Sequence, residues 1–294
     1  FAKVKNESLD QALDIVSDLY LNPVFYAKEI EKEKGVIIEE INMYEDVPQH
    51  KVKYLFMELV YGDQPAGWAV AGKKEVIRVL QKSDFLKYRG AQYLPHATIV
   101  VVAGSFDETK ITHDIESHFS SLPDGAKGVM EKVVEKQDVP QELIKFKESD
   151  QTHMIMGFRA FGVSDKRRFA LEVLADILGG GMSSRLFQKV REEMGAAYYV
   201  GAGADLYADH GLIAMSAGLD HKKVEAVIEA SLKEFARFKE AKVSHEELTR
   251  AKEHLSGQLV LSLETSDELG YFYGGQEVMG IPLMTPEQVI AAVR

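Results

Sequence analysis

The sequence predicts an α+β fold in which two duplicated domains each combine a mostly antiparallel sheet with covering helices. Two observations predict it. Strand-like and helix-like patterns follow one another in the same order twice along the 294 residues. The composition, with 46% apolar and 28% charged residues, is that of a globular protein long enough to bury two cores.

The repeated unit begins with a strand followed by a capped helix. Residues 2–5 alternate like a strand, and Ser8 is placed to cap a helix whose apolar residues follow the helical period. In the second half, residues 211–217 repeat the strand pattern and Asp220 repeats the cap. The shared order indicates a tandem duplication.

Later parts of the two copies also correspond. Each copy continues with an acidic helix, one from about Tyr26 and the other from about His245. The helix expected near Ser83 corresponds to the one expected at Thr285. We therefore expect both copies to share one plan over much of their length.

The two copies differ at their ends. Ahead of its strand at 211–217, the second copy has additional predicted elements: a hairpin of strands 142–148 and 153–160, two helices over about 165–193, and a strand at 196–204. The first copy instead finishes with a strand at 98–103 and a helix at 107–121. These differences predict that the chain is truncated at both ends.

The comparison of the two copies divides the chain into three predicted regions. Residues 1–123 are predicted to form an N-terminal domain that lacks its first segment, and residues 142–294 a C-terminal domain that is incomplete at its end. Residues 124–141 are polar and rich in lysine, and glycine and proline interrupt them, which favours a linker.

Charge and cysteine content exclude several classes of function. A formal net charge of −11 gives no positive field for nucleic acid, and no apolar run is long enough to span a membrane. The absence of cysteine excludes disulfides, thiolate zinc sites and cysteine nucleophiles. We expect a soluble protein, whose compartment stays open between the cytoplasm and the periplasm or exterior.

An acidic helix in the first half carries two carboxylates at a suggestive spacing. Glu33 and Glu40 are seven residues apart, which is almost two helical turns, so both emerge on one side about 10 Å apart along the axis. Surface helices are rich in glutamate, and the spacing alone therefore favours a solvated face over a ligand and its supporting carboxylate.

The most specific stretch of the sequence is LGGGMSSRLFQKVREEMGAAYYV, at residues 178–200. It lacks the Gly-Lys-Ser/Thr ending of a phosphate-binding loop and follows a helix rather than a strand. We predict instead that its glycines end one helix, that Ser183 caps the next and that Gly195 stops it. The nearest look-alike of a zinc-binding helix, RAKEH at residues 250–254, has arginine where the first histidine should stand, and arginine cannot bind zinc.

Taken together, the acidic helix and the glycine-rich stretch resemble the zinc metallopeptidases of the inverted-motif family (M16 type), which includes pitrilysin, insulinase and the processing peptidases. YLNPVFYAKEIEKEKGVIIEEINMYEDVPQHKVKYLF resembles the helix that follows the zinc motif in this family. The resemblance implies Glu40 as a ligand of Zn²⁺ and Glu33 as its supporting carboxylate. It also implies a His-x-x-Glu-His motif, which should precede Phe1.

The glycine-rich stretch resembles the signature of the family's second domain. The resemblance implies that Arg191 and Tyr198 reach across an interdomain cavity to hold the substrate carbonyl and its developing oxyanion. If the register is off by one residue, Tyr199 replaces Tyr198. The alternative is that Arg191 forms a surface ion pair and Tyr198 lies in a sheet.

The resemblance implies a zinc endopeptidase that cleaves extended peptides in a chamber between two facing domains. The alternative is a non-catalytic member of the family that acts as a binding or partner subunit, and a homodimer is also consistent with the resemblance. Peptides are the expected partners, with no nucleic acid and no membrane span. Because one carboxylate cannot hold zinc tightly, we expect the 294-residue chain alone to be inactive.

Overall fold

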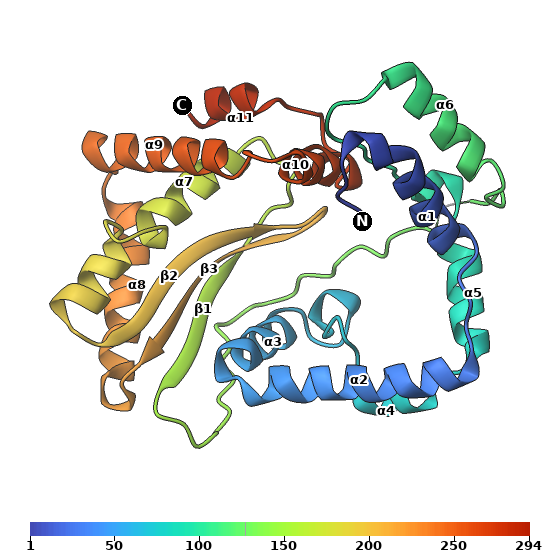
Figure 1. Cartoon of the computed structure of the whole chain (residues 1–294). Coiled ribbons are helices and arrows are strands. Elements are labelled where there is room, and N and C mark those ends of the chain that lie inside the picture. The colour runs from blue at the N-terminus through green and yellow to red at the C-terminus, as the bar shows by residue number, and fades with distance from the viewer. Residues whose placement is uncertain (127) are drawn as a thin grey trace. The chain divides into compact units, whose positions relative to one another are not determined.

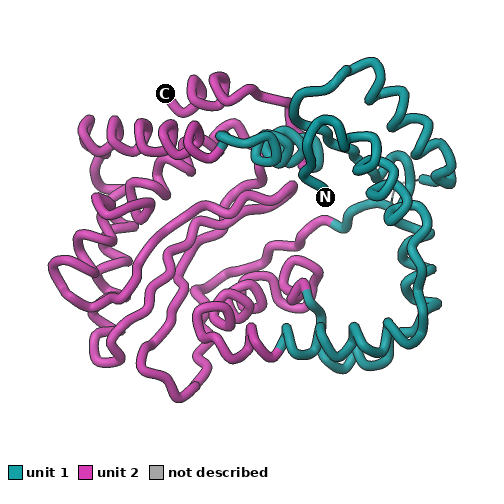
Figure 2. The backbone as a smooth tube through the Cα atoms, viewed as in Figure 1, with its two compact units in different colours: residues 1–41, 71–131, 263–278 teal, residues 42–70, 132–262, 279–294 magenta. Residues whose placement is uncertain are grey.

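The chain divides into two compact units in its computed structural model, which describes residues 1–126 and 128–294 (Figures 1 and 2). Unit 1 comprises residues 1–41, 71–131 and 263–278. Unit 2 comprises residues 42–70, 132–262 and 279–294. The division falls inside the helix α2 (Ala27–Asp46), which begins in unit 1 and ends in unit 2.

Unit 1 is helical throughout its described elements. Besides the first part of α2 it contains α1 (Leu9–Leu21), α4 (Lys74–Val79), α5 (Lys82–Gln92), α6 (Glu108–Phe119), α10 (Ser266–Val278) and the short 3-10 helices η1 (Asn6–Ser8) and η3 (Pro95–Ala97). Asp107 caps α6 by accepting a hydrogen bond from the Lys110 main-chain nitrogen at 2.8 Å.

Aromatic and polar contacts hold the C-terminal end of α1. The Tyr20 ring packs against Tyr93 and Phe119, with ring centroids 4.9 and 5.8 Å apart. The Arg89 guanidinium donates to the main-chain oxygens of Tyr20 at 3.0 Å and Leu21 at 2.5 Å. These carbonyls lie in the last turn of α1 and have no partner within the helix, so a cation is favourable there.

Unit 2 contains the sheet. Its elements are α3 (Pro48–Tyr61), η2 (Pro65–Gly67), β1 (Thr152–Ala160), α7 (Arg168–Gly179), the π-helix η4 (Phe187–Glu193), β2 (Ala197–Leu206), β3 (Gly211–Leu219), η5 (His221–Lys223), α8 (Val224–Glu240), α9 (His245–Leu261) and α11 (Pro286–Val293). Thr285 and Gln288 form a reciprocal capping box at the start of α11.

The three strands form one antiparallel sheet in the order β1-β3-β2. Met215 and Ala217 of the central strand β3 are fully buried and pack with Leu178 of α7, Val190 of η4 and Val227 of α8. One face of the sheet is thus covered by helices, as Figure 1 shows for α7 and α8. This arrangement confirms the predicted α+β fold class.

Three of the predicted strands are confirmed and three are wrong. The predictions at 153–160, 196–204 and 211–217 match β1, β2 and β3. Residues 2–5, 98–103 and 142–148 form no strand, so the hairpin predicted for 142–148 with β1 does not exist and the described strands all lie in unit 2. Alternation predicts an extended, half-buried segment, but a strand also needs a neighbour that supplies hydrogen-bond partners.

The segment 98–103 illustrates this difference. Val101 packs within unit 1 against α10, so closely that a Cβ added at Gly274 would lie 3.0 Å from its Cγ2 atom. Val101 makes this contact while 46% exposed, and no strand of the described chain pairs with the segment. None of the helices in the described part of the chain combines the length and apolar character needed to cross a membrane.

Candidate functional site

The helix α2 carries both glutamates that the sequence singled out. It is continuous through Gly35, as predicted, and Glu33 and Glu40 are both exposed. The neighbouring Lys34 is buried instead, where its Nζ donates to Glu31 at 2.6 Å and to the Arg78 carbonyl at 3.2 Å. Lys34 therefore anchors α2 within unit 1, and the two glutamates project to solvent.

These carboxylates do not make a zinc site with the residues around them. Residues 1–126 and 128–294 contain no group of three or more His, Asp or Glu side chains that could hold a metal ion. They also supply no hydrogen-bond or ion-pair partner for the Glu33 or Glu40 carboxylate. Because protein zinc sites use three or four protein ligands, the described residues alone do not fit a bound zinc ion.

The histidine of the RAKEH segment has a structural role. The His254 Nδ1 atom lies 2.7 Å from a carboxylate oxygen of Asp176, and its Nε2 atom lies 3.0 Å from the Gln258 side-chain nitrogen. Both ring nitrogens are engaged, beside a cavity of about 260 Å³ that Gly181 also lines. Neighbouring side chains of unit 2 therefore hold the His254 ring in place.

The glycine-rich turn after α7 serves close packing. The helix α7 ends at Gly179, and a Cβ added at this glycine would lie 2.2 Å from the main-chain nitrogen of Ala202 in β2. Only glycine therefore allows α7 to approach β2 so closely. This contact explains the first glycine without a phosphate ligand.

The following helix differs from its prediction in detail. Ser183 does not cap it, because the first helical hydrogen bond of this turn runs from the Gln188 nitrogen to the Ser184 carbonyl at 3.0 Å. The helix continues as the π-helix η4, which is a rare form that often occurs at functional sites. The predicted stop is confirmed, since Gly195 has φ +52°.

The structure brings Arg191 and Tyr198 together at the start of β2. In the pairing with β3, Ala197 lies opposite Leu219 and Tyr199 lies opposite Gly218, so Tyr198 is the additional residue of a β-bulge. The Arg191 guanidinium donates a hydrogen bond to the Tyr198 carbonyl. Arg191 therefore stabilises the irregular backbone at this bulge.

The bulge also determines where the two tyrosines point. The Tyr198 side chain is 62% exposed. Tyr199 is half-buried, its hydroxyl lies 3.0 Å from the His153 Nδ1 atom, and burial raises the pKa of its phenol. Of the two registers left open by the sequence, Tyr198 is the one whose phenol is accessible.

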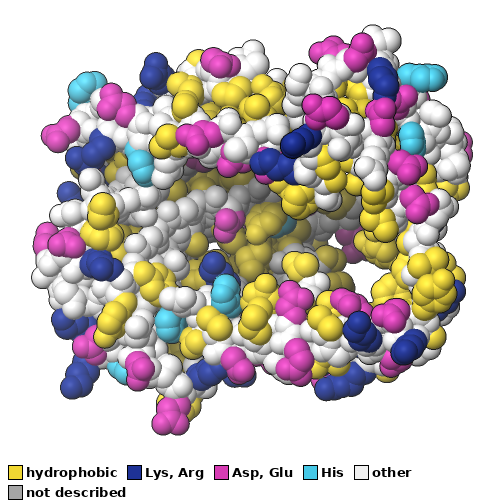
Figure 3. Space-filling model, in the orientation of Figure 1, with side chains coloured by type: hydrophobic (Ala, Val, Ile, Leu, Met, Phe, Trp, Pro, Cys, Tyr) yellow, Lys and Arg dark blue, Asp and Glu magenta, His cyan; other side chains and the backbone are white. Residues whose placement is uncertain are grey.

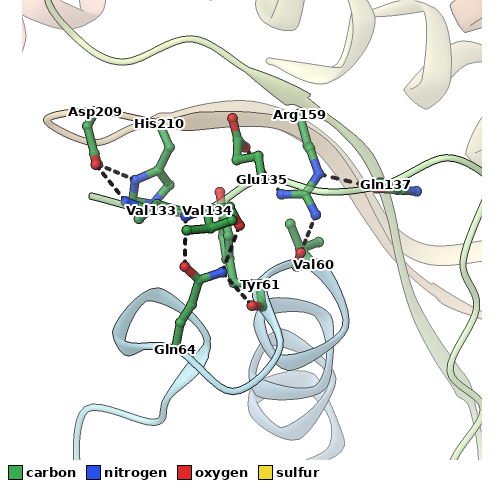
Figure 4. A network of polar contacts seen from close by, with 10 residues as sticks. All are labelled: Val60, Tyr61, Gln64, Val133, Val134, Glu135, Gln137, Arg159, Asp209 and His210. Atoms are coloured by element: carbon green, nitrogen blue, oxygen red, sulfur yellow. Dashed lines mark hydrogen bonds and ion pairs between the residues drawn. The ribbon is translucent and has the colours of Figure 1, made fainter. Parts of the chain in front are cut away.

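A second polar cluster fixes part of the predicted linker. The extended residues 133–137, which we call the strap, lie beside α3 and the sheet within unit 2 (Figure 4). The Gln64 side chain forms two hydrogen bonds with the Val134 main chain, at 2.9 and 3.0 Å, and Asp209 accepts from the Val133 nitrogen at 2.9 Å. Arg159 pairs with Glu135 at 3.2 Å.

Sequence reasoning did not identify this cluster. Tyr61 lies at its centre with 4% exposure, under the Arg159 guanidinium, and burial raises the pKa of its phenol. The hydrogen bond between Asp209 and His210 lowers the pKa of the Asp209 carboxyl. No spacing rule links these residues, because they come from α3, the strap, β1 and the loop between β2 and β3.

The visible surface has mixed charge. Acidic and basic side chains are interspersed over the face shown in Figure 3. The sequence carries 46 acidic against 35 basic residues. The surface in this view therefore shows no large block of a single sign.

The fold and the site together define a mixed helix and sheet domain that presents an arginine and an exposed tyrosine at a β-bulge. Family models identify the class of protein. Residues 1–74 match the model described as insulinase (peptidase family M16), and residues 80–255 match the one described as peptidase M16 inactive domain. The chain belongs to peptidase family M16.

Similar proteins agree with this assignment. A Bacillus subtilis protein described as an uncharacterized zinc protease is 33% identical over 267 residues, which cover 91% of this chain and 64% of that protein. The chain thus spans about two thirds of that relative's length. A protease from Helicobacter pylori has a similar structure, with TM-score 0.85 and 18% identity over 99% of this chain and 74% of its own.

A third match is a chain of another solved structure. A chain in a structure of complex III from Candida albicans has TM-score 0.87 and 17% identity, covering 99% of this chain and 71% of its own. At these identities the two solved structures show a shared fold. The zinc protease description belongs to the sequence relatives.

Proposed function

We propose that the protein is a zinc-dependent endopeptidase that cleaves extended peptides or unstructured segments in a chamber between its two peptidase-type domains. The observation that carries this proposal is the pair formed by Arg191 and the exposed Tyr198 at the bulge of β2. Identity of 33% to a relative described as a zinc protease supports the reaction class. In this proposal Glu40 is a zinc ligand and Glu33 supports it.

The chemistry of the pair suits peptide binding. Arginine has five N–H donors, and among the described residues the Arg191 side chain uses its hydrogen bonding only on the Tyr198 carbonyl. The remaining donors can hold a substrate carbonyl or carboxylate. The accessible Tyr198 hydroxyl can donate to the carbonyl oxygen on which negative charge develops during peptide hydrolysis.

The test of these roles uses the full-length gene product. We expect about one zinc per chain by elemental analysis and cleavage of an internally quenched fluorescent peptide. Replacing Tyr198→Phe should lower kcat by about 10- to 100-fold without changing zinc content, because it removes one donor to the oxyanion. Tyr88→Phe changes an equally exposed tyrosine of unit 1 and is the control.

The metal role of Glu40 needs its own variant. Glu40→Gln should lower zinc affinity by at least about tenfold, since it replaces a charged ligand with an amide. Glu29→Gln, on the same helix and similarly exposed, should leave zinc content unchanged. A wild-type protein that neither binds zinc nor cleaves peptides would reject the proposal.

The isolated 294-residue chain should behave differently from the full-length protein. We expect no tightly bound zinc and no measurable cleavage, because Glu40 is a single carboxylate and the described residues form no metal-binding cluster around it. Equilibrium dialysis with zinc and the same peptide assay measure this. Stoichiometric, tight zinc binding by the isolated chain would contradict it.

A second candidate is a non-catalytic partner subunit. The description of the family model matched by residues 80–255 as an inactive domain favours it. A partner subunit would purify without zinc or peptidase activity and would form a stable complex with an M16 relative. Size-exclusion chromatography of the full-length protein, alone and mixed with such a relative, separates the two candidates.

A further inference from the structure

Three residues form a bridge across the sheet beside the bulge. In the antiparallel pairing, His153 of β1 and Tyr199 of β2 lie opposite the same residue of the central strand, Gly218. The Tyr199 hydroxyl lies 3.0 Å from the His153 Nδ1 atom, and the two rings are stacked with centroids 5.9 Å apart at 28°. The two edge strands are therefore linked over the backbone of the strand between them.

Glycine is required at the middle of this bridge. A Cβ added at Gly218 would lie 2.5 Å from the Tyr199 Cε1 atom and 2.9 Å from its Cδ1 atom. Its φ is not in the left-handed region, so space rather than backbone conformation calls for glycine. Any other side chain would push the Tyr199 ring away from His153.

The bridge coincides with the point where the strands change register. Because Tyr199 is held opposite Gly218 and Ala197 pairs with Leu219, the additional residue between them has to be Tyr198. A β-bulge bends its strand and redirects a side chain, and here it leaves the Tyr198 phenol exposed beside Arg191. The position of Tyr198 thus depends on the anchoring of Tyr199.

We propose that His153 is a positioning residue of the peptidase reaction, which holds Tyr199 across Gly218 and thereby sets the bulge that presents Tyr198 and Arg191 to the substrate. This inference rests on the proposed function. Burial lowers the pKa of His153, which favours the neutral imidazole, whose Nδ1 atom can accept a hydrogen bond from the Tyr199 hydroxyl. His153 itself contacts Tyr199 and is not placed against the substrate.

Kinetics of the full-length enzyme give the first test. His153→Leu removes the acceptor and Tyr199→Phe removes the donor. Each should lower kcat by about tenfold with KM within about twofold, since a small displacement of a catalytic group costs rate more than binding. The double variant should be no slower than either single variant, because both changes break one contact.

The chain offers a matched control for these variants. Tyr207 follows β2 and stacks on His210, with centroids 4.5 Å apart, so it forms a second Tyr–His pair away from the bulge. Tyr207→Phe should leave kcat unchanged. Unchanged kcat in His153→Leu, a rise in KM alone, or additive losses in the double variant would overturn the inference.

A second measurement separates this inference from the proposed function. In the isolated chain, amide hydrogen exchange at residues 197–200 should be about tenfold faster in His153→Leu than in the wild type, and unchanged in Tyr207→Phe. Equal exchange rates at residues 197–200 in the wild type and both variants would overturn the anchoring role of His153, even if the enzyme is active. An inactive full-length wild type would reject the proposed function, and exchange alone would then decide whether His153 sets the bulge.

Discussion

Unit 1 and unit 2 differ in what holds their elements together. The large side chains that are fully buried belong to unit 2, and they include Leu178, Leu212 and Met215. The buried apolar side chains of unit 1, Leu13, Leu94 and Ile111, retain 5 to 8% exposure. Unit 2 therefore has the more completely buried core, and the apolar side chains of unit 1 are less fully enclosed.

The largest change in stability is expected when a central core side chain of unit 2 is removed. Met215→Ala should lower the free energy of unfolding of unit 2 by about 3 kcal/mol, because Met215 is fully buried in the cluster behind the sheet. Trp68 is the single tryptophan and lies in unit 2, so its fluorescence during urea unfolding measures this. Met182→Ala, at 74% exposure, is the control and should change little.

The same substitution, glycine to alanine, should change stability in opposite directions in the two units. Gly179→Ala should destabilise unit 2 by about 2 kcal/mol, because the new Cβ would overlap the main chain of β2. Gly35→Ala should stabilise α2 in unit 1 by up to about 1 kcal/mol, since nothing lies within 4 Å of the added Cβ and alanine favours helix. Hydrogen exchange of each helix reports the change, and the same sign at both positions would contradict the contrast.

The smallest effect concerns an ion pair of unit 2. Arg185 forms a double hydrogen bond with Glu247, at 2.7 and 3.1 Å, and this contact lowers the pKa of Glu247 to about 2. The pair contributes fully to folding stability above pH 4.5, the pKa of the Glu247 carboxyl in the unfolded chain. This contribution is lost as the pH falls toward 2. Because the pair is partly exposed to solvent, we expect only about 1 kcal/mol.

The measurement is the unfolding midpoint in urea at pH 7 and at pH 3, for the wild type and Glu247→Gln. The variant should lose stability at pH 7 and approach the wild type at pH 3. Glu229→Gln, at an exposed pair with Lys233, is the control. An equal difference between wild type and Glu247→Gln at both pH values would show that the ion pair does not provide the stability.

Local patterns were sufficient for the helices and for the central strand. The helices predicted at 107–121 and from Thr285 match α6 and α11, whose capping contacts act within one turn of the chain. The cap predicted at Ser8 is wrong in detail, because Ser8 precedes α1 without a side-chain capping hydrogen bond. The apolar run of β3 is likewise a property of consecutive residues. The strands predicted at 2–5, 98–103 and 142–148 failed because pairing depends on a distant partner that no local pattern reveals.

The candidate site also has one part that the local sequence predicts and one part that depends on distant residues. The signature that contains Arg191 and Tyr198 could be recognised, and the structure brings these two residues together. The bulge, which decides between Tyr198 and Tyr199, could not be predicted, because it depends on how β2 pairs with Gly218 of another strand. The partnership of Tyr199 with His153, 46 residues earlier, is also a product of sheet topology.

The unpaired segment 142–148 has a practical consequence for handling the isolated chain. Ile144 and Phe146 are 84% and 91% exposed in a stretch that forms no helix or strand and pairs with none of the described strands. Such a segment is a template on which a second copy can add a strand, so association should grow with protein concentration. A charged residue at position 144 would oppose this self-association while leaving the buried core of unit 2 intact.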